Sequence, residues 1–199
     1  YMIGEVRKAR SRLSNHLVNA MSVTTKPMTL EEYLNYDDGT DTRYELVNGE
    51  LIAMPPESRL NVKIAIFLLT QFLKLGIPEN QLAMKTQIAV SGSRATAREP
   101  DLIVLSEDAA IALDEAKQSL ITHDMPPPLL VVEVVSPKQE NRDYRHKRTE
   151  YAGRQIPEYW IVDPIAQKVK VMQWVDGSYE EQVYQGETAI GSPLFPALT

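Results

Sequence analysis

Hydrophobic residues follow two different rhythms along this chain. Between residues 59 and 75 they recur every three or four positions, which predicts an amphipathic helix that ends at Gly76. The segments 101–105 and 129–135 are instead short apolar runs rich in β-branched residues, as is typical of buried strands. Similar patterns predict further strands at 85–90 and 158–162, and further helices at 107–116 and 141–153. Because strands and helices alternate, we expect an α/β (α+β) fold with a mixed central sheet flanked by helices.

Turn residues add two hairpins to this core. Asn48-Gly49 lies inside the alternating run 44–52, and both residue types tolerate the positive φ of a tight turn. Asp176-Gly177 predicts a second hairpin between strands near 167–175 and 178–184. The expected architecture is therefore a central sheet with added β-hairpins.

Two other local patterns concern a helix start and a loop. Thr29 and Glu32 have the Thr-x-x-Glu spacing of a capping box, which predicts a short helix from Leu30. The polar stretch 91–97 is expected to be a flexible loop, with Arg98 at its far end.

Composition fits one ordinary globular domain, because the chain has 199 residues, 43% of them hydrophobic and 24% charged. Residues 1 to about 20 resemble a weakly amphipathic helix or a disordered arm, so we expect an arm or helix over 1–27 and one domain over 28–199. No signal-peptide pattern follows the basic N-terminal residues, and no apolar run approaches the ~20 residues of a membrane span. The chain has no cysteine, which excludes disulfides and thiolate zinc sites. We expect a cytoplasmic protein without a membrane partner.

Charge narrows the kinds of partner. The net charge of −6 argues against a protein that coats nucleic acid without specificity, because that mode of binding needs a basic face. The segment 138–154 is a local exception, with six basic residues against three acids. Its basic residues are Lys138, Arg142, Arg145, Lys147, Arg148 and Arg154. Such a run is either a solvated face or a contact surface for a ligand.

Asp101 and Glu133 each place one carboxylate in or beside an apolar strand. Burying a lone carboxylate is costly unless something binds it. If the two strands are neighbours, the carboxylates form a site for a hard divalent cation such as Mg²⁺, which prefers carboxylate oxygen and water. The sequence therefore points to a metal-dependent active site.

A helix face supplies a candidate cation for the same site. Asp143, Lys147 and Tyr151 are spaced i, i+4 and i+8, which lines them along one face of the predicted helix 141–153. If that face looks toward the sheet, the Lys147 ammonium would orient an attacking water and offset negative charge on a phosphate. The alternative is an ordinary surface pair between Asp143 and Lys147, worth only ~0.3–0.5 kcal/mol.

The order of these motifs resembles that of the PD-(D/E)XK phosphodiesterase superfamily. The stretch from about Met28 to Val175 is similar to a bacterial restriction-endonuclease-like family known as a domain of unknown function. The matching pieces are Tyr44-Glu45-Leu46, Asn48-Gly49-Glu50, Pro100-Asp101, the run from Val132 to Pro137, Asp143, Lys147, Tyr151 and the run from Glu158 to Val162. The Pro-Asp motif alone is a weak signal, whereas the ordered set is fairly specific.

The resemblance implies roles for four residues. Asp101 and Glu133 would bind the divalent cation, Mg²⁺ or Mn²⁺. Glu45 would be an acidic helper, and Lys147 would be the lysine of the superfamily.

The chain departs from the superfamily pattern at two places. The lysine is expected two residues after Glu133, where this chain has Val135. Lys147 on the following helix is our replacement, with Lys138 and Lys85 as weaker candidates. The family also often has a histidine at the start of the long central helix, where this chain has Asn61 or a near neighbour.

The first functional hypothesis is a metal-dependent endonuclease that hydrolyses DNA phosphodiester bonds. The resemblance implies a symmetric homodimer with one site per strand. The residues expected to contact the substrate are Arg94, Arg142, Arg145, Arg148 and Tyr151, mostly through phosphates.

Two alternatives stay open. A catalytically weakened nucleic-acid- or protein-binding module would use the same fold, because a fold does not guarantee its chemistry. A structural or toxin-partner protein would use 44–54 and 157–175 as its interface, and it would expose a large apolar patch there.

Overall fold

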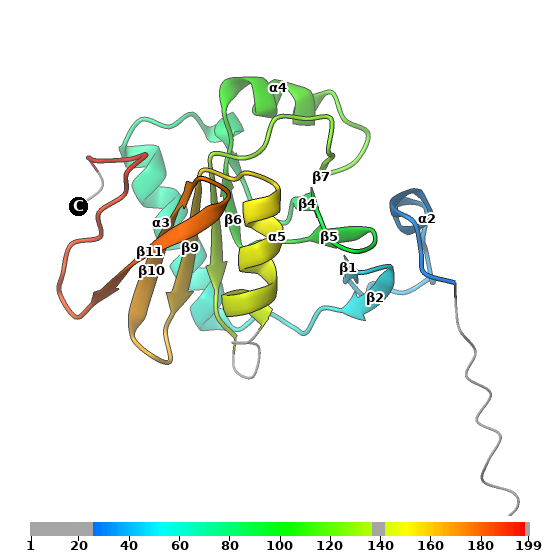
Figure 1. Cartoon of the computed structure of the whole chain (residues 1–199), viewed down its shortest axis with the longest axis horizontal. Coiled ribbons are helices and arrows are strands. Elements are labelled where there is room, and N and C mark those ends of the chain that lie inside the picture. The colour runs from blue at the N-terminus through cyan, green and yellow to red at the C-terminus, as the bar shows by residue number, and fades with distance from the viewer. Residues whose placement is uncertain (1–25, 137–141, 198–199) are drawn as a thin grey trace, which may run out of the picture.

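The computed structural model describes residues 26–136 and 142–197 (Figure 1). The expected N-terminal arm therefore lies outside the described residues, apart from Lys26 and Pro27, and so does Lys138. None of the described helices combines the length and apolarity needed to cross a bilayer.

Helices and strands alternate along the described chain. The helices are α2 (Leu30–Leu34), α3 (Arg59–Lys74), the 3₁₀ turn η1 (Glu79–Gln81), α4 (Glu107–Asp114), the π-helix η2 (Arg142–Lys147) and α5 (Arg148–Gly153). The strands are β1 (Tyr44–Val47), β2 (Glu50–Ala53), β3 (Leu82–Ala83), β4 (Gln87–Val90), β5 (Thr96–Arg98), β6 (Leu102–Val104), β7 (Leu120–Ile121), β8 (Leu130–Val134), β9 (Glu158–Asp163), β10 (Lys168–Val175) and β11 (Ser178–Gln185).

The strands form two mixed sheets within the described residues. The small sheet has the order β2-β1-β5-β4-β7, and the large sheet has the order β11-β10-β9-β8-β6-β3. The α+β class is confirmed, but the single central sheet that we expected is divided in two. Two of the passages from one sheet to the other are short: one is at Lys85, which has φ +57° between β3 and β4, and one is around Pro100, between β5 and β6. Neither a left-handed residue nor a proline continues a strand ladder, so the division occurs at these points.

Both hairpins and the capping box are confirmed. Asn48 and Gly49 have φ values of +51° and +81°, and Asp176 and Gly177 have +47° and +91°. These left-handed pairs explain the tight turns between β1 and β2 and between β10 and β11. In the capping box, the Glu32 amide donates to the Thr29 hydroxyl, and the Thr29 amide donates to the Glu32 carboxylate.

The predicted loop 91–97 is too long by two residues. Thr96 and Ala97 belong to β5, where Ala97 pairs with Leu46 of β1 and with Ala89 of β4. All three residues of β5 are buried, including Arg98. A three-residue strand that pairs with the nearby β4 and the distant β1 has little local signature, and its polar composition resembles that of a loop.

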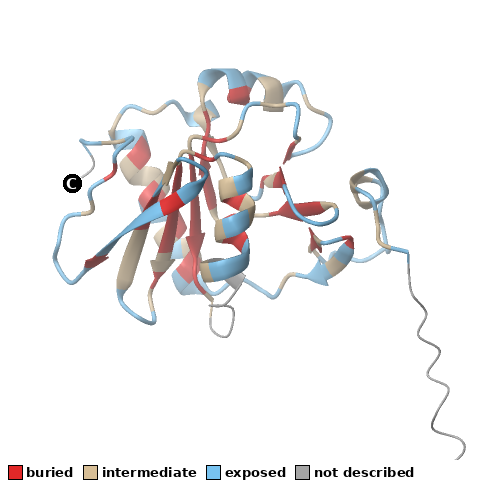
Figure 2. Ribbon diagram, in the orientation of Figure 1, coloured by how far each residue is buried: buried red, intermediate tan, exposed pale blue. Residues whose placement is uncertain are grey.

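Side-chain alternation along β8 separates the two faces of the large sheet. Leu130 and Val132 pack with Phe72 of α3, whereas Val131 and Val135 pack with Tyr151 of α5. Figure 2 shows this strand buried along its whole length. Because alternate residues share a face, Glu133 belongs to the face that α5 covers.

The pairing of β8 with β9 is parallel, which obliges the chain to cross over one face of the sheet. The crossover contains η2 and α5, which lie in front of the large sheet in Figure 1, opposite α3. This crossover fixes where the side chains of α5 can reach.

The hairpins do not carry the apolar patch that the interface alternative requires. Among the described residues of 44–54 and 157–175, the exposed large hydrophobics are Ile52 on β2 of the small sheet and Ile165 in the turn between β9 and β10 of the large sheet. Several exposed large hydrophobics lie instead on α3.

Candidate active site

The register of the large sheet brings the two predicted carboxylates together. β6 and β8 are antiparallel, with Leu102 opposite Val132, so the next step along the ladder sets Asp101 opposite Glu133. The Asp101 amide donates to the Val132 carbonyl, and the Asp101 carboxylate accepts a 2.6 Å hydrogen bond from the Val134 amide. Asp101 and Glu133 both line one cavity.

Glu133 is only 4% exposed, and both of its oxygens have partners. The Lys147 ammonium lies 2.6 Å from Oε2, and the Tyr151 hydroxyl donates to Oε1 at 2.7 Å. Burial, and then the negative charge of Glu133, raise the pKa of Tyr151 well above its usual value. Tyr151 therefore stays a neutral donor that fixes the orientation of the carboxylate.

The predicted helix 141–153 is present, but its first part is a π-helix. η2 ends at Lys147, and α5 continues from Arg148. Lys147 and Tyr151 both face the sheet, at 1% and 0% exposure. A surface position for Lys147 is therefore wrong, whereas the side chain of Asp143 lies outside the described residues.

Glu45 reaches the same group of charges from the small sheet. Its side chain is fully buried on β1, and its Oε1 lies 3.9 Å from the Lys147 ammonium. The same oxygen accepts from the Glu99 amide at 3.1 Å. The buried ammonium is thus held between Glu133 of the large sheet and Glu45 of the small sheet.

Arg98 is a site residue that the sequence analysis missed. Its guanidinium, 1% exposed, donates to Glu45 at 3.2 Å and makes a two-pronged contact with Glu150 at 2.7 and 2.8 Å. Burial alone would lower the pKa of Arg98, but the hydrogen bonds and charges of Glu150 and Glu45 outweigh it and raise that pKa. Arg98 stays charged and links β5, β1 and α5. The sequence did not single out Arg98, because it directly follows the predicted loop 91–97.

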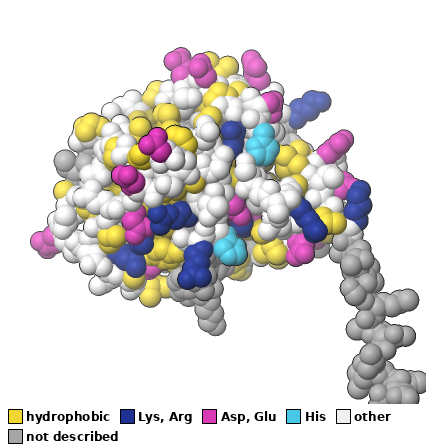
Figure 3. All heavy atoms as spheres, viewed as in Figure 1, with side chains coloured by type: hydrophobic (Ala, Val, Ile, Leu, Met, Phe, Trp, Pro, Cys, Tyr) yellow, Lys and Arg dark blue, Asp and Glu magenta, His cyan; other side chains and the backbone are white. Residues whose placement is uncertain are grey.

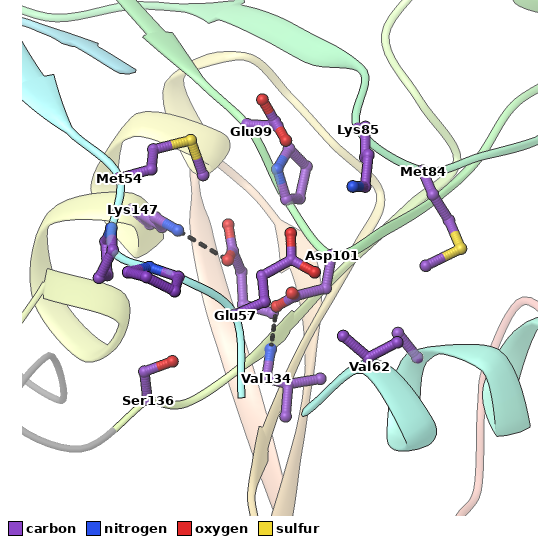
Figure 4. A pocket seen from close by; sticks show the side chains of 15 residues that line it. Met54, Glu57, Val62, Met84, Lys85, Glu99, Asp101, Val134, Ser136 and Lys147 are labelled. Carbon is purple, nitrogen blue, oxygen red and sulfur yellow. Dashed lines mark hydrogen bonds and ion pairs between the residues drawn. The ribbon is translucent and has the colours of Figure 1, made fainter. Parts of the chain in front are cut away.

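The cavity has a volume of about 60 Å³ and lies between the two sheets (Figure 4). Its lining includes acidic side chains, two lysines and apolar side chains from five segments. The polar lining residues are Glu57, Lys85, Glu99, Asp101, Glu133, Ser136 and Lys147. Figure 4 shows the side chains of Lys147 and Lys85 on opposite sides, with the carboxylates of Glu99 and Asp101 between them.

The donor set fits a hard divalent cation through two carboxylates. Asp101 and Glu133 would supply oxygen ligands, because a carboxylate has about four lone-pair sites and one hydrogen bond to an oxygen does not exhaust it. Mg²⁺ usually keeps several waters and uses one or two carboxylates. Within 26–136 and 142–197, no group of three or more His, Cys, Asp or Glu residues is arranged to hold a metal. A site here would therefore complete its coordination with water and substrate oxygen.

Asn61 lies near the start of α3, the region where a family histidine was expected at Asn61 or a near neighbour. It lies in the first turn of α3 at 5% exposure, and its amide donates to the Val134 carbonyl at 3.1 Å and to the Ser136 hydroxyl at 3.0 Å. Asn61 thus fixes the end of β8 beside Glu133. An amide does not take up a proton at neutral pH, so its contribution here is positional.

The predicted substrate-binding residues are scattered. Arg94 and Arg145 are exposed, and neither lines the cavity. Arg148 instead contacts β11, donating to Glu181 at 2.8 Å and to the Tyr179 carbonyl at 2.7 Å. The side chain of Arg142 is outside the described residues, and Tyr151 is buried behind Glu133. On the face shown in Figure 3, Lys and Arg side chains alternate with acids and form no continuous basic patch.

Comparison with known proteins identifies the family. The Uma2 family model, described as "putative restriction endonuclease", matches residues 30–199. The chain belongs to the Uma2 family. This membership confirms the resemblance drawn from the sequence and indicates nuclease activity. Families of the restriction-endonuclease type typically use divalent metals.

One solved structure supports the fold of this Uma2 protein. It is the crystal structure of "a putative nuclease belonging to DUF820" from Anabaena variabilis, with a TM-score of 0.68 and 17% sequence identity. The match covers 86% of this chain and 92% of that chain. Identity this low shows the shared fold alone. No curated protein matches the chain.

Proposed function

We propose that this Uma2 protein is a nuclease that hydrolyses DNA phosphodiester bonds with the help of Mg²⁺ or Mn²⁺. The observation that carries the proposal is the meeting of Asp101 and Glu133 at one cavity, with the Lys147 ammonium 2.6 Å from Glu133. Carboxylates on neighbouring strands beside a buried cation are what phosphodiester hydrolysis with a metal needs.

Asp101 and Glu133 would hold the cation. When bound, the metal would lower the pKa of a water and stabilise the charge that develops on the phosphate. Lys147 would position that water and offset negative charge. Tyr151 would keep Glu133 oriented, as outer partners of metal ligands commonly do.

Glu45 has a separate role in this proposal. Lys147 and a bound metal would share Glu133, and Glu45 at 3.9 Å offers the ammonium a second carboxylate. Arg98 holds Glu45 in place from the other side. Lys147 would thus keep a carboxylate partner in Glu45 while Glu133 holds the metal.

The test combines Mn²⁺ titration calorimetry with a plasmid-nicking assay. We expect Asp101→Ala to abolish both Mn²⁺ uptake and nicking. Lys147→Ala should keep the uptake but slow nicking by about a hundredfold, comparable to removing one electrostatic stabiliser. Glu187→Ala, an exposed acid distant in sequence from the site, is the matched control and should behave like the parent. Unchanged uptake in Asp101→Ala would show that the site is assigned wrongly.

The domain limits and assembly are also proposed. We propose one domain over 28–199 that acts as a symmetric homodimer, so that each copy cuts one strand. Sedimentation of the full chain with a duplex should then give two protein copies per DNA.

A second candidate function is a binding module on the same scaffold. It is favoured by the contacts that both oxygens of Glu133 already make, an ion pair with Lys147 and a hydrogen bond from Tyr151, and by the lack of a three-acid group among the described residues. A protein that binds DNA but takes up no Mn²⁺ and nicks no plasmid would fit this function instead.

A further inference from the structure

Two open grooves continue outward from the active cavity and meet at Lys85. One, of about 340 Å³, runs along the end of α2, β1 and β4 and is lined by Tyr33, Tyr36, Tyr44 and Gln87. The other, of about 400 Å³, lies against the segment before β1 and the segment after β2. Lys85 lines both grooves and the active cavity as well, so the three spaces share its side chain.

Lys85 is held in an unusual backbone conformation. Its φ of +57° is uncommon for a residue with a side chain, and it occurs where the chain leaves the large sheet for the small one. The side chain is exposed and has no hydrogen bond or ion pair with any described residue. Figure 4 shows it across the cavity from Lys147. Strained residues of this kind cluster at functional sites.

Tyr36 presents an aromatic ring in the first of the two grooves, the one of about 340 Å³ that Lys85 also lines. It is 41% exposed, and it meets Tyr44 edge-to-face with centroids 5.8 Å apart. The wall behind the rings is rigid, because the Tyr33 hydroxyl donates to the Tyr44 carbonyl and accepts from the Gln87 amide, both at 2.6 Å. An exposed ring on a rigid wall is a stacking platform for a base.

The charges along the grooves leave Lys85 available. Arg43, which lines both grooves, is paired with Glu57 at 3.1 Å and with Glu99, so its charge is already engaged and one negative charge of this group remains. Asp41 lines only the second groove, the one of about 400 Å³. Lys85 is therefore the cation placed to meet a phosphate at the entrance of the active cavity.

We infer that the groove bounded by Lys85 and Tyr36 binds an unpaired DNA strand that leads into the active cavity. Lys85 contacts a backbone phosphate next to the scissile one, and Tyr36 stacks on a base. A volume of about 340 Å³ is at the small end of ligand pockets, so it admits one nucleoside at a time and no stacked duplex. The inference rests on the proposed nuclease function and deepens it by naming single-stranded or locally melted DNA as the substrate.

The test is fluorescence anisotropy in EDTA, so that binding is measured without cleavage. The probes are a fluorescein-labelled single strand of about 12 nucleotides and its duplex. We expect the parent to bind the single strand at least about tenfold more tightly. Tyr36→Ala should weaken that binding by about tenfold, whereas Tyr36→Phe, which keeps the ring, should not.

Lys85→Gln should also weaken binding about tenfold and reduce the salt slope by about 0.7, as expected for one lost phosphate contact with a single strand. Tyr36→Ala should leave that slope unchanged. Lys74→Gln, at an exposed lysine of α3, is the control with the same change of charge.

Equal affinity for single strand and duplex, or equal effects of Lys85→Gln and Lys74→Gln, would overturn the inference. These outcomes are distinct from failure of the nuclease proposal. Binding that depends on Lys85 and Tyr36 without any nicking would support the groove and reject the nuclease. Nicking without that dependence would do the reverse.

Discussion

The large sheet buries two glutamates on adjacent strands, and they have opposite surroundings. Glu158 of β9 is fully buried and accepts from three neutral donors: the Trp160 indole at 2.5 Å, the Ser192 hydroxyl at 2.7 Å and the Leu194 amide at 3.1 Å. Glu133 of β8 contacts an ammonium and lines a cavity. Burial of a carboxylate thus does not by itself mark a site. What sets Glu133 apart from Glu158 is a charged partner together with space for a ligand.

This difference also explains what each glutamate does for the fold. Glu158 attaches the segment 192–194 to the sheet, because its donors come from that segment as well as from β9. Glu133 connects β8 to the crossover through Lys147 and Tyr151. The first is a structural clamp, and the second belongs to the proposed chemistry.

The sharpest test of the comparison is isosteric neutralisation of each glutamate. Glu133→Gln should lower nicking by about a thousandfold, because it removes a charged ligand of the proposed metal and the partner of Lys147. Glu158→Gln should leave the nicking rate of folded protein close to that of the parent. Plasmid-nicking rates, normalised to the folded fraction from circular dichroism, measure both. Equal losses in the two variants would contradict a functional difference between Glu133 and Glu158.

Arg98→Met tests whether the charges around Lys147 form one buried network. The change leaves Glu45 and Glu150 without their shared cation, so the free energy of unfolding should fall by about 3–5 kcal/mol. Urea denaturation at neutral pH measures it. As a control, Arg148→Met removes a half-exposed cation paired with Glu181, and should cost no more than about 1 kcal/mol. Similar losses in both variants would argue against a special network at Arg98.

Tyr151→Phe removes one hydrogen bond from Glu133 and keeps the ring. We expect a loss of about 1–2 kcal/mol in the free energy of unfolding. Nicking should slow by about tenfold, because the orientation of Glu133 loosens. The matched variant Tyr179→Phe removes the hydrogen bond to the Ile156 carbonyl, away from the cavity. It should cost similar stability without slowing nicking.

The pKa of Tyr151 gives the smallest effect. Burial raises that pKa in the folded state, and the unfolded value is about 10. The stabilisation by Tyr151 is therefore complete below pH 10 and is lost as pH rises above 10, because only the unfolded chain releases the proton there. The stability advantage of the parent over Tyr151→Phe should shrink by about 1.4 kcal/mol per pH unit in that range. Urea denaturation at pH 9, 10 and 11 measures it, and a constant advantage would contradict the pKa direction.

Local signals sufficed for much of the fold. The turn at Asn48-Gly49 and the helix start at Thr29 depend on a few adjacent residues, so their sequences determine them. The strand at 130–134 is identified by its continuous apolar run. Arg98 could not be placed in this way, because its strand has only three residues and one of its two partners, β1, is distant in the sequence.

The sequence indicated which residues would form the candidate site better than it indicated which contacts they would make. Spacing put Lys147 and Tyr151 on one helical face, and the structure turns that face toward Glu133. Nothing local indicated that Glu45 would approach from a second sheet, or that Lys85 would take a left-handed conformation where the sheets divide. Both depend on how the two sheets are arranged.

The parallel neighbours β8 and β9 have a consequence for how such a site can change. A parallel pair requires a connection that returns over one face of the sheet, and here that connection is η2 followed by α5. A helix is thus already present above the strand that carries Glu133, whatever residue stands at 135. A basic side chain can leave the strand and reappear on this helix without any new element, as we propose for Lys147. The topology thus allows the ammonium a second position, on the helix and not on the strand.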